Sequence, residues 1–283
     1  MFRTPDWIKQ HIHSVDHIED IRESTFETIN KRLTQRETAS PKVSILVAAW
    51  NEEKNILNCI SSLSAMETTI PYEIIVINNN STDNTQKILD KLHIRSLFQP
   101  IQGCGPARQL GQENARGDYI LLADADCVYP SCWLDEMMNR LSAEGVVCVY
   151  GRYSFIPEKG YPRWKLFLLE RMKDVIAEVR HFKRPYLNAY GISMGYVKEY
   201  GLKAGYVMHK IWGDDGRLCF DLMPYGKIKQ VRKNTARAWT GPRTLERDGG
   251  FTKAIAARIS KEARRFFSLF RPLPPHDTKT SKN

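Results

Sequence analysis

The sequence of 283 residues predicts an α/β fold, in which a mixed, mostly parallel sheet is flanked by helices. Between residues 42 and 123, short β-rich apolar runs alternate with segments of helical periodicity. These runs are apolar almost throughout, as in strands that are buried on both faces of a parallel sheet. Polar clusters follow where several of the runs end, which is where such sheets bind ligands.

The first 40 residues form a polar leader of mixed charge. Apolar residues recur in it at helical spacing, at Ile18, Ile21, Phe26, Ile29 and Leu33. A Thr- and Ser-containing stretch that ends at Pro41 is typical of a linker. We therefore expect an N-terminal helical extension that is an appendage to the main domain.

The alternating units follow in order. The strands are expected at 43–48, 72–77, 96–98 and 119–123. The helices are expected after Asn51, after the Asn78–Asp83 turn, and over 107–115 behind the turn Gly103–Pro106.

Two carboxylates, Asp124 and Asp126, follow the last of these strands at a spacing of one residue. Side chains alternate along a strand, so the spacing predicts that both point the same way and can share a divalent cation. An Asp after a strand can also cap the next helix or turn. Residues 48–52 and 78–80 end neighbouring strands, and the carboxyl ends of parallel strands meet at one edge. Three polar clusters at one edge favour a binding site.

Cysteine spacing and hydropathy bear on the compartment. The six cysteines include no Cys-x-x-Cys pair, which argues against a zinc site and a disulfide framework. No run of about eighteen apolar residues occurs, and the N-terminus lacks the apolar core of a secretion signal. We expect reduced thiols and a cytoplasmic location.

Charge is unevenly distributed along the chain. Residues 1–150 carry 14 basic and 20 acidic residues, whereas residues 151–283 carry 28 basic and 12 acidic residues. A cationic half of this kind can meet nucleic acid, anionic lipid or an acidic substrate, or it can simply be a solvated face. No nucleic-acid-binding module or aromatic stacking platform is recognisable, so we expect no nucleic-acid partner.

The order of motifs resembles the inverting family 2 glycosyltransferases, which have the Rossmann-like GT-A fold. The resemblance covers roughly residues 42–240. It implies a GT-A domain over 41–240, an extension or linker over 1–40, and a C-terminal basic region over 241–283. The motifs that carry it are Val47-Ala48-Ala49-Trp50-Asn51-Glu52-Glu53, Ile77-Asn78-Asn79-Asn80-Ser81-Thr82-Asp83, Gly105-Pro106-Ala107-Arg108-Gln109-Leu110-Gly111, Gly117-Asp118 through Asp124-Ala125-Asp126, and Trp212-Gly213-Asp214-Asp215.

This resemblance implies a nucleotide-diphosphate sugar as donor and Mn²⁺ or Mg²⁺ as cofactor. Asp126 is implied to ligate the metal, with Asp124 as a second ligand or a ribose partner, and Arg108 to lie near the diphosphate. A hard cation on carboxylate oxygens neutralises the charge that develops on a leaving diphosphate. The remaining residues implied to bind the donor are Ala48, Trp50, Glu52, Asn78, Asn80 and Ala125.

The second half of the site follows from the same resemblance. Asp215 is implied as the general base that deprotonates an acceptor hydroxyl, with Asp214 as its orienting partner or as a helix cap. Adjacent carboxylates can raise one pKa towards neutrality, which suits a base. The implied acceptor is a glycan or a lipid-linked sugar. The residues expected on the acceptor side are Gly191, Ser193, Met194 and Trp212.

The sequence departs from the family pattern at two places. Asn78 and Asn79 stand where acidic residues are usual, so an uncharged amide replaces a carboxylate, although UDP is still the favoured nucleotide. The family often has a histidine after the base that completes the metal shell, and residues 236–240 contain none. His209 could substitute, although a lone histidine is more often a packing or surface residue.

The basic C-terminal region offers two further features. Arg243 and Arg247 lie in a glycine-containing loop that could close over a diphosphate. Residues 253–270 have the pattern of a basic amphipathic helix, which either lies in an anionic membrane interface or docks on the domain. Residues 164–182 have a similar composition, and we expect them to pack internally with an amphipathic outer edge.

Two other functions are considered. A nucleotidyltransferase of related fold usually has a phosphate-binding loop rich in Gly and Lys/Arg after the first strand. Residues 48–52, which follow the first strand here, do not form such a loop. A non-catalytic, membrane-associated scaffold would have no need of both Asp126 and Asp215. The expected function is therefore metal-assisted transfer of a sugar to a hydroxyl group.

Overall fold

The structure of the chain is a computed structural model that describes residues 2–13, 18–209, 213–243 and 245. The strands are β1 (Val43–Ala49), β2 (Tyr72–Asn78), β3 (Arg95–Phe98), β4 (Tyr119–Asp124), β5 (Cys127–Val128), β6 (Val146–Tyr150), β7 (Tyr153–Phe155), β8 (Met194–Val197), β9 (Lys227–Gln230) and β10 (Ala238–Thr240). The α-helices are α1 (Glu23–Gln35), α2 (Ile56–Ser64), α3 (Thr85–Asp90), α4 (Cys104–Asn114), α5 (Trp133–Leu141), α6 (Arg163–Lys183), α7 (Lys198–Ala204) and α8 (Asp214–Leu222). The 3-10 helices are η1 (Asp6–Gln10), η2 (Ile18–Asp20), η3 (Pro185–Asn188), η4 (Gly191–Ser193), η5 (Met223–Tyr225) and η6 (Asn234–Ala236).

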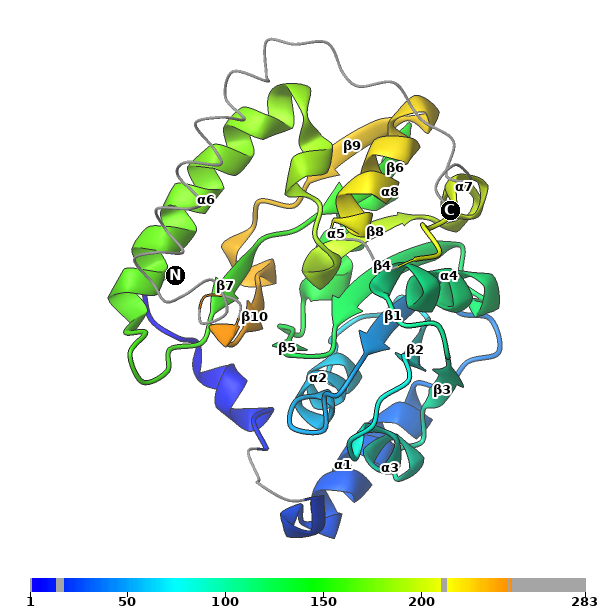
Figure 1. The fold of residues 1–283 in the computed structure, drawn as a ribbon, viewed down its shortest axis with the longest axis vertical. Coiled ribbons are helices and arrows are strands. Elements are labelled where there is room, and N and C mark those ends of the chain that lie inside the picture. Colours follow the sequence, from blue (N-terminus) through cyan, green and yellow to red (C-terminus); the bar gives the residue numbers. More distant parts are fainter. Residues whose placement is uncertain (1, 14–17, 210–212, 244, 246–283) are drawn as a thin grey trace.

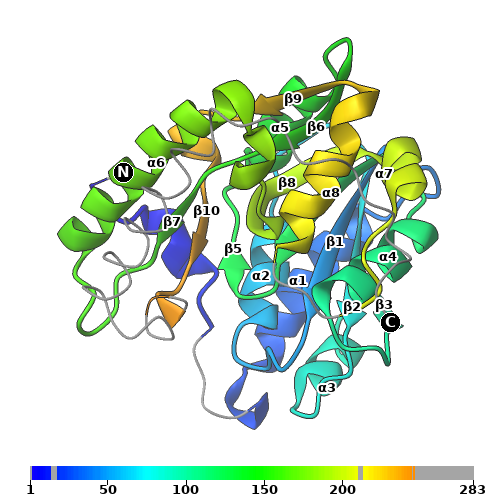
Figure 2. The same cartoon turned by 45° about the horizontal axis from the view of Figure 1, so that its top comes forward.

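Seven strands form the central sheet, in the order β3-β2-β1-β4-β8-β6-β9 (Figures 1 and 2). The first four are mutually parallel, β8 runs antiparallel to both β4 and β6, and β9 is parallel to β6. A smaller sheet has the order β5-β10-β7. The expected strands and the mixed, mostly parallel sheet are confirmed.

Alternation along each strand divides the core between the two faces of the sheet. In β4, Leu121 packs into one apolar cluster and Ile120 and Leu122 into the other. The first cluster is covered by α1, α2 and α5, and the second by α4 and α8. Figure 2 shows the sheet enclosed between these two layers of helices. Helices shield both faces of the sheet from solvent, which explains why its central strands are apolar almost throughout.

The N-terminal segment is a structural part of the domain, which corrects the expectation of an appendage. Phe26 and Ile29 of α1 are fully buried in the core cluster that also contains α2. Ile8 of η1 packs against Trp239 in the small sheet. Because the leader is polar on average, its few apolar side chains were a weak signal of this packing.

Helix α6 lies at the edge of the molecule beside the small sheet, in both views (Figures 1 and 2). The expectation that residues 164–182 pack internally holds for Leu166 and Leu169, which are buried. It is wrong for Leu168, Val175 and Val179, which are exposed. No helix among the described residues combines the length and the apolar character needed to cross a bilayer.

Candidate active site

The ends of β1, β2 and β4 lie side by side. Ala48 is in register with Ile77 of β2 on one side and with Asp124 of β4 on the other. The loops after β1 and β2 are linked, because the side-chain oxygen of Asn51 accepts a hydrogen bond of 2.8 Å from the backbone N–H of Thr82. The three polar clusters therefore converge on one edge of the sheet, as the sequence predicts.

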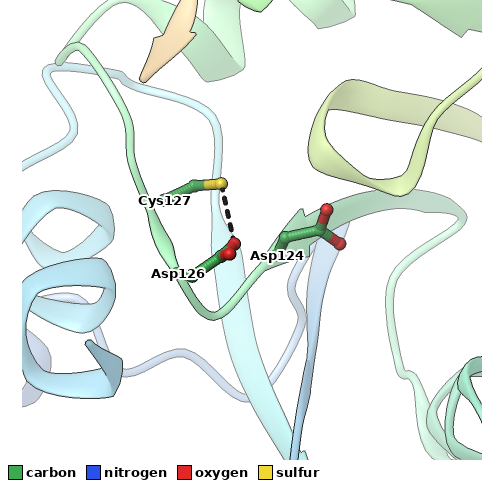
Figure 3. A group of neighbouring side chains, drawn as sticks. All are labelled: Asp124, Asp126 and Cys127. Atoms are coloured by element: carbon green, nitrogen blue, oxygen red, sulfur yellow. Dashed lines mark hydrogen bonds between the residues drawn. The ribbon is translucent and has the colours of Figure 1, made fainter. Parts of the chain in front are cut away.

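Asp124 and Asp126 lie close together for a different reason than expected. Strand β4 ends at Asp124, and Asp126 lies in the turn that follows, so strand alternation does not align the two side chains. Figure 3 shows Asp126 directed towards Cys127 and Asp124 directed away from it. One ligand atom from each of these three residues still lies within 4.8 Å of the others.

The chemistry of this group fits a hard divalent cation. Carboxylate oxygens are the ligands that Mn²⁺ and Mg²⁺ prefer, and Asp124 and Asp126 supply them. Burial and the neighbouring carboxylates raise the pKa of the Cys127 thiol well above its usual range, so its sulfur is neutral and donates to Asp126 over 3.3 Å. His209 is exposed and is not a member of the group.

Arg243 joins the acidic residues of two strand ends. Its Nη2 donates to Glu52 over 2.7 Å and to Asp126 over 2.8 Å. Burial raises the pKa of Glu52, and the guanidinium of Arg243 opposes that rise. Arg243 thus supplies positive charge at the carboxylate that the sequence assigns to the metal.

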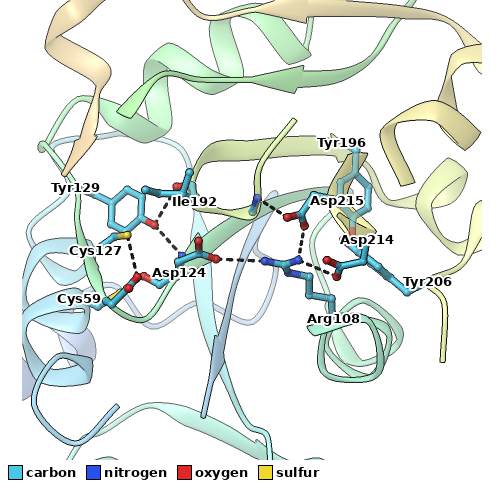
Figure 4. Close-up of polar contacts among 12 residues, drawn as sticks. Cys59, Arg108, Asp124, Cys127, Tyr129, Ile192, Tyr196, Tyr206, Asp214 and Asp215 are labelled. Atoms are coloured by element: carbon cyan, nitrogen blue, oxygen red, sulfur yellow. Dashed lines mark hydrogen bonds and ion pairs between the residues drawn. The ribbon is translucent and has the colours of Figure 1, made fainter. Parts of the chain in front are cut away.

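Arg108 of α4 is the centre of a second network, drawn in Figure 4. Its buried guanidinium donates to Asp124 over 3.2 Å, to Asp214 over 3.0 Å, and to Asp215. It thereby connects the end of β4 to the start of α8, which lie far apart in the sequence. Burial raises the pKa of Asp124 to about 7, because desolvation and the nearby carboxylates outweigh the attraction of Arg108.

Asp215 has the environment of a candidate general base. Its Oδ2 accepts a hydrogen bond of 2.8 Å from the backbone N–H of Gly191, and its Oδ1 accepts one from Arg108. Burial raises its pKa to about 6, because desolvation and the charge of Asp214 outweigh the opposing effect of Arg108. Asp214 is the first residue of α8 and the cap position belongs to Gly213, so Asp214 orients Arg108 and does not cap the helix.

The loop before β8 approaches this network with its backbone. A Cβ added to Gly191 would lie 1.8 Å from Nη2 of Arg108 and 3.1 Å from Oδ1 of Asp215. Only glycine leaves room for the guanidinium at this position. The glycine that the sequence associates with the acceptor side therefore has a geometric reason to be there.

Ser193 and Met194 correct the expected acceptor side. The Ser193 hydroxyl is buried and accepts a hydrogen bond of 2.9 Å from Nε1 of Trp133. Met194 is fully buried in the core as the first residue of β8. Neither side chain has surface with which to line an acceptor pocket in this structure.

The asparagines expected on the donor side make hydrogen bonds within the loops and with the helix that follows. The Asn78 amide donates to Gln86 over 2.7 Å and accepts from the backbone of Ser81. Asn80 has a positive φ of 58° and leads the chain into the next helix. Trp50 is exposed beside these loops. Ala125 is buried in the core, so its side chain cannot contact a donor and only its backbone could.

Two residues position the site by hydrogen bonds: Tyr129, which sequence reasoning missed, and Asn79, which it noted only as a departure from the family pattern. The Tyr129 hydroxyl accepts from the backbone N–H of Asp124 over 2.8 Å and donates to the carbonyl of Ile192 over 3.0 Å. Asn79 donates to the carbonyls of Gln99 and Ile101 and so fixes the loop before α4. For Tyr129 the sequence offered no signal beyond its nearness to Asp126. Trp212, Arg247 and the 253–270 segment lie outside the described residues.

Solved structures share this fold at low sequence identity. Glucosyl-3-phosphoglycerate synthase from Mycobacterium tuberculosis, in complex with Mn²⁺, UDP and phosphoglyceric acid, is 19% identical with a TM-score of 0.53, over 83% of this chain and 82% of that one. The mannosyltransferase PcManGT from Pyrobaculum calidifontis, in complex with GDP-Man and Mn²⁺, is 14% identical with a TM-score of 0.55, over 84% and 72%.

Sequence comparisons point the same way. Glycosyltransferase AglE of Haloferax volcanii is 30% identical over 151 residues, which is 49% of each chain. The chain spans about half the length, or less, of the curated relatives it matches. The family model described as "Glycosyl transferase family 2" matches residues 44–198, more than half of the chain. This span holds the donor-side strands and the Asp124–Asp126 pair described above, and the chain belongs to glycosyl transferase family 2.

Proposed function

We propose that this chain transfers a sugar from a nucleotide-diphosphate sugar to a hydroxyl group of a glycan or a lipid-linked acceptor, with inversion at the anomeric carbon. The observation that carries the proposal is the arrangement around Arg108. One buried guanidinium joins Asp124, on the donor side, to Asp215, the candidate base. This connection supports the proposal that a diphosphate-binding edge and a proton acceptor belong to one continuous site.

Asp126 and Asp124 are the residues that would hold Mn²⁺ or Mg²⁺. A cation bound there would supply positive charge beside the diphosphate of the donor. Arg243 now pairs with Glu52 and Asp126, and more than half of its side chain is exposed, so it is free to turn towards phosphate oxygens. We assign Arg243 to the leaving diphosphate, because a guanidinium fork suits phosphate oxygens.

Asp215 removes the proton from the acceptor hydroxyl in this proposal. With a pKa of about 6, its carboxylate is mostly ionised at neutral pH yet basic enough to accept a proton as the sugar bond forms. Gly191 and Arg108 hold its two oxygens, so the carboxylate is oriented before the acceptor arrives. The acceptor oxygen attacks the face of the sugar opposite the diphosphate, which gives inversion.

The favoured donor is a UDP-sugar, and the favoured acceptor is a lipid-linked sugar presented at an anionic membrane. The neighbours of this fold hold UDP in one case and GDP-Man in the other, which supports the donor class. The basic second half of the chain supports an anionic surface. A cytoplasmic location is consistent with a nucleotide-sugar donor and with an acceptor at an anionic membrane surface.

The experiment is a panel of nucleotide sugars tested with Mn²⁺ for thermal stabilisation and for release of the nucleoside diphosphate. Ligands that bind only the folded state raise the melting temperature. Asp126→Asn is expected to abolish both the stabilisation and the release. Asp118→Asn is the matched control, because Asp118 is an exposed carboxylate just before the opposite end of β4. Unchanged metal-dependent binding and turnover in Asp126→Asn would overturn the proposal.

A further inference from the structure

Helix α6 turns a stripe of large apolar side chains outward. Trp164, Leu168, Val175, Val179 and Phe182, here called the outer stripe, have relative exposures between 49% and 84%. At 100° per residue, these five positions fall within an arc of about 60°. Figures 1 and 2 place α6 at the edge of the molecule, away from the central sheet.

The inner face of α6 has a mixed character, because charged side chains are buried there beside Leu166 and Leu169. Glu170, Asp174 and Arg180 are buried there. Glu170 pairs with Arg163 over 2.6 Å, and Asp174 accepts a hydrogen bond from Arg237. A surface helix ordinarily faces its apolar side to the core and its charges to water. Helix α6 departs from this order, because its inner face buries Leu166 and Leu169 together with these charged residues while the outer stripe is a second apolar surface. Packing among the described residues does not account for the outer stripe.

The rim of the stripe is positively charged. Arg171 is exposed at one edge, where it pairs over 3.6 Å with Asp174, a carboxylate that Arg237 also binds. Lys183 is exposed at the other edge, and the Lys165 ammonium lies 5.5 Å from the Trp164 ring centroid. Glu178 is the one exposed acidic residue within α6.

That glutamate is neutralised by two arginines. Arg152 donates to it over 2.5 Å and Arg232 over 2.8 Å. The rim is therefore cationic around an apolar centre. This pattern complements an anionic lipid surface, and it would repel an identical stripe on a second copy.

Aromatic side chains extend the apolar surface at its ends. Trp164 lies at the start of α6 and Phe182 at its end, about 27 Å apart along the helix axis. Phe2 is exposed and packs edge-on against Phe167, with ring centroids 5.6 Å apart. Tryptophan is enriched at the headgroup level of membranes, where its ring meets both apolar chains and water.

We propose that α6 lies in the interface of an anionic bilayer, with the outer stripe inserted among the upper acyl chains and the basic rim at the headgroups. The chain passes from the end of α6 through η3 to Gly191, whose N–H holds Asp215. Docking through α6 thus sets the acceptor side beside the membrane. The docking needs no sugar transfer, but its use in presenting a lipid-linked acceptor rests on the proposed function.

The test is flotation of the full chain with phosphatidylcholine vesicles, with and without phosphatidylglycerol. The wild-type chain is expected to float with the anionic vesicles. A triple variant, Leu168→Ser/Val175→Ser/Phe182→Ser, is expected to lose at least about tenfold in bound fraction, since three inserted side chains are removed. The matched control is Phe98→Ser/Leu202→Ser, which removes two exposed apolar side chains from other elements and is expected to bind like wild type.

Any of the following results would overturn the proposal. The first is an unchanged bound fraction in the triple variant, and failure of the wild-type chain to bind anionic vesicles counts equally against it. The second is a wild-type dimer that the triple variant loses without any vesicle binding, which would assign the stripe to a second copy. The third is binding that survives the triple substitution but disappears on removal of residues 251–283. Donor turnover in the absence of vesicles is measured in parallel, so failure of membrane docking and failure of the proposed transfer are read separately.

Discussion

Replacement of Arg108 by methionine tests whether the buried network holds the two halves of the site together. The side chain is similar in length, so packing is largely kept while the positive charge is removed. Asp214 and Asp215 are then left with little exposure and without their guanidinium partner. Breaking a buried ion pair by removing one partner typically costs about 3–5 kcal/mol, because the remaining charge stays desolvated. We expect a loss of this size near pH 8.

The loss should shrink at lower pH. Folding raises the pKa of Asp215 to about 6 and that of Asp124 to about 7. A carboxyl group with a raised pKa contributes stability below its unfolded pKa and loses it as the pH rises through the folded value. Arg108 limits both rises, so in Arg108→Met the two pKa values move higher. For the buried Asp215, each further unit adds about 1.4 kcal/mol to the loss near pH 8 but little near pH 5. Asp124 adds less, because its side chain is 37% exposed and water screens its charge.

The assay is urea unfolding followed by tryptophan fluorescence near both pH values. The control is Arg232→Met, which removes a half-exposed guanidinium that pairs over 2.8 Å with the exposed Glu178 and is expected to cost less than about 1 kcal/mol. A loss below about 1 kcal/mol for Arg108→Met, or an equal loss at the two pH values, would refute the reasoning about uncompensated carboxylates.

Three more predictions follow from the geometry. Gly191→Ala should lower kcat by about a hundredfold, since its Cβ would displace the Arg108 guanidinium; steady-state kinetics on the folded variant measure this, and near-normal turnover would contradict it. The pH profile of kcat/KM should fall below about pH 6 as Asp215 is protonated, and Asp215→Asn should lower turnover about 10²- to 10⁴-fold while donor binding persists; a profile flat through this range would exclude Asp215 as the base. Phe26→Ala should cost about 3–5 kcal/mol in urea unfolding, because α1 is part of the core; a loss within error of zero would mean that α1 is an appendage after all.

The sequence was informative about the proposed donor half of the site because strand pattern and strand-end position are local properties. Apolar runs identified β1, β2 and β4, and parallel pairing then brings their carboxyl ends together. The prediction that Asp126 lies at that edge was correct. The predicted direction of its side chain rested on strand alternation, which does not apply because Asp126 lies in a turn. The apolar pattern of β4 located Asp126 in the sequence, and the geometry of the turn determined where its side chain points.

Contacts between distant segments could not be read in the same way. Nothing in the sequence shows that Arg108 bridges Asp124 and Asp215, since such a contact depends on how α4 and α8 pack. Ser193 and Met194 stand in a motif associated with the acceptor, but strand pairing and tight packing bury them. Apolar periodicity in α6 showed that one face is apolar, whereas only the structure shows that this face points outward.

The sequence separation of the contacts in the site constrains when the site can form during synthesis. Arg243 pairs with Glu52 across 191 positions, and Asp215 meets Arg108 across 107. Such long-range contacts close last on a chain that emerges from its N-terminal end. A fragment restricted to residues 44–198 would contain the donor strands and the Asp124–Asp126 pair but neither Asp215 nor Arg243. A nascent chain can therefore assemble the strands that carry Asp124 and Asp126 before Asp215 and Arg243 have been synthesised, so under the proposed function the metal-binding residues would form ahead of the base.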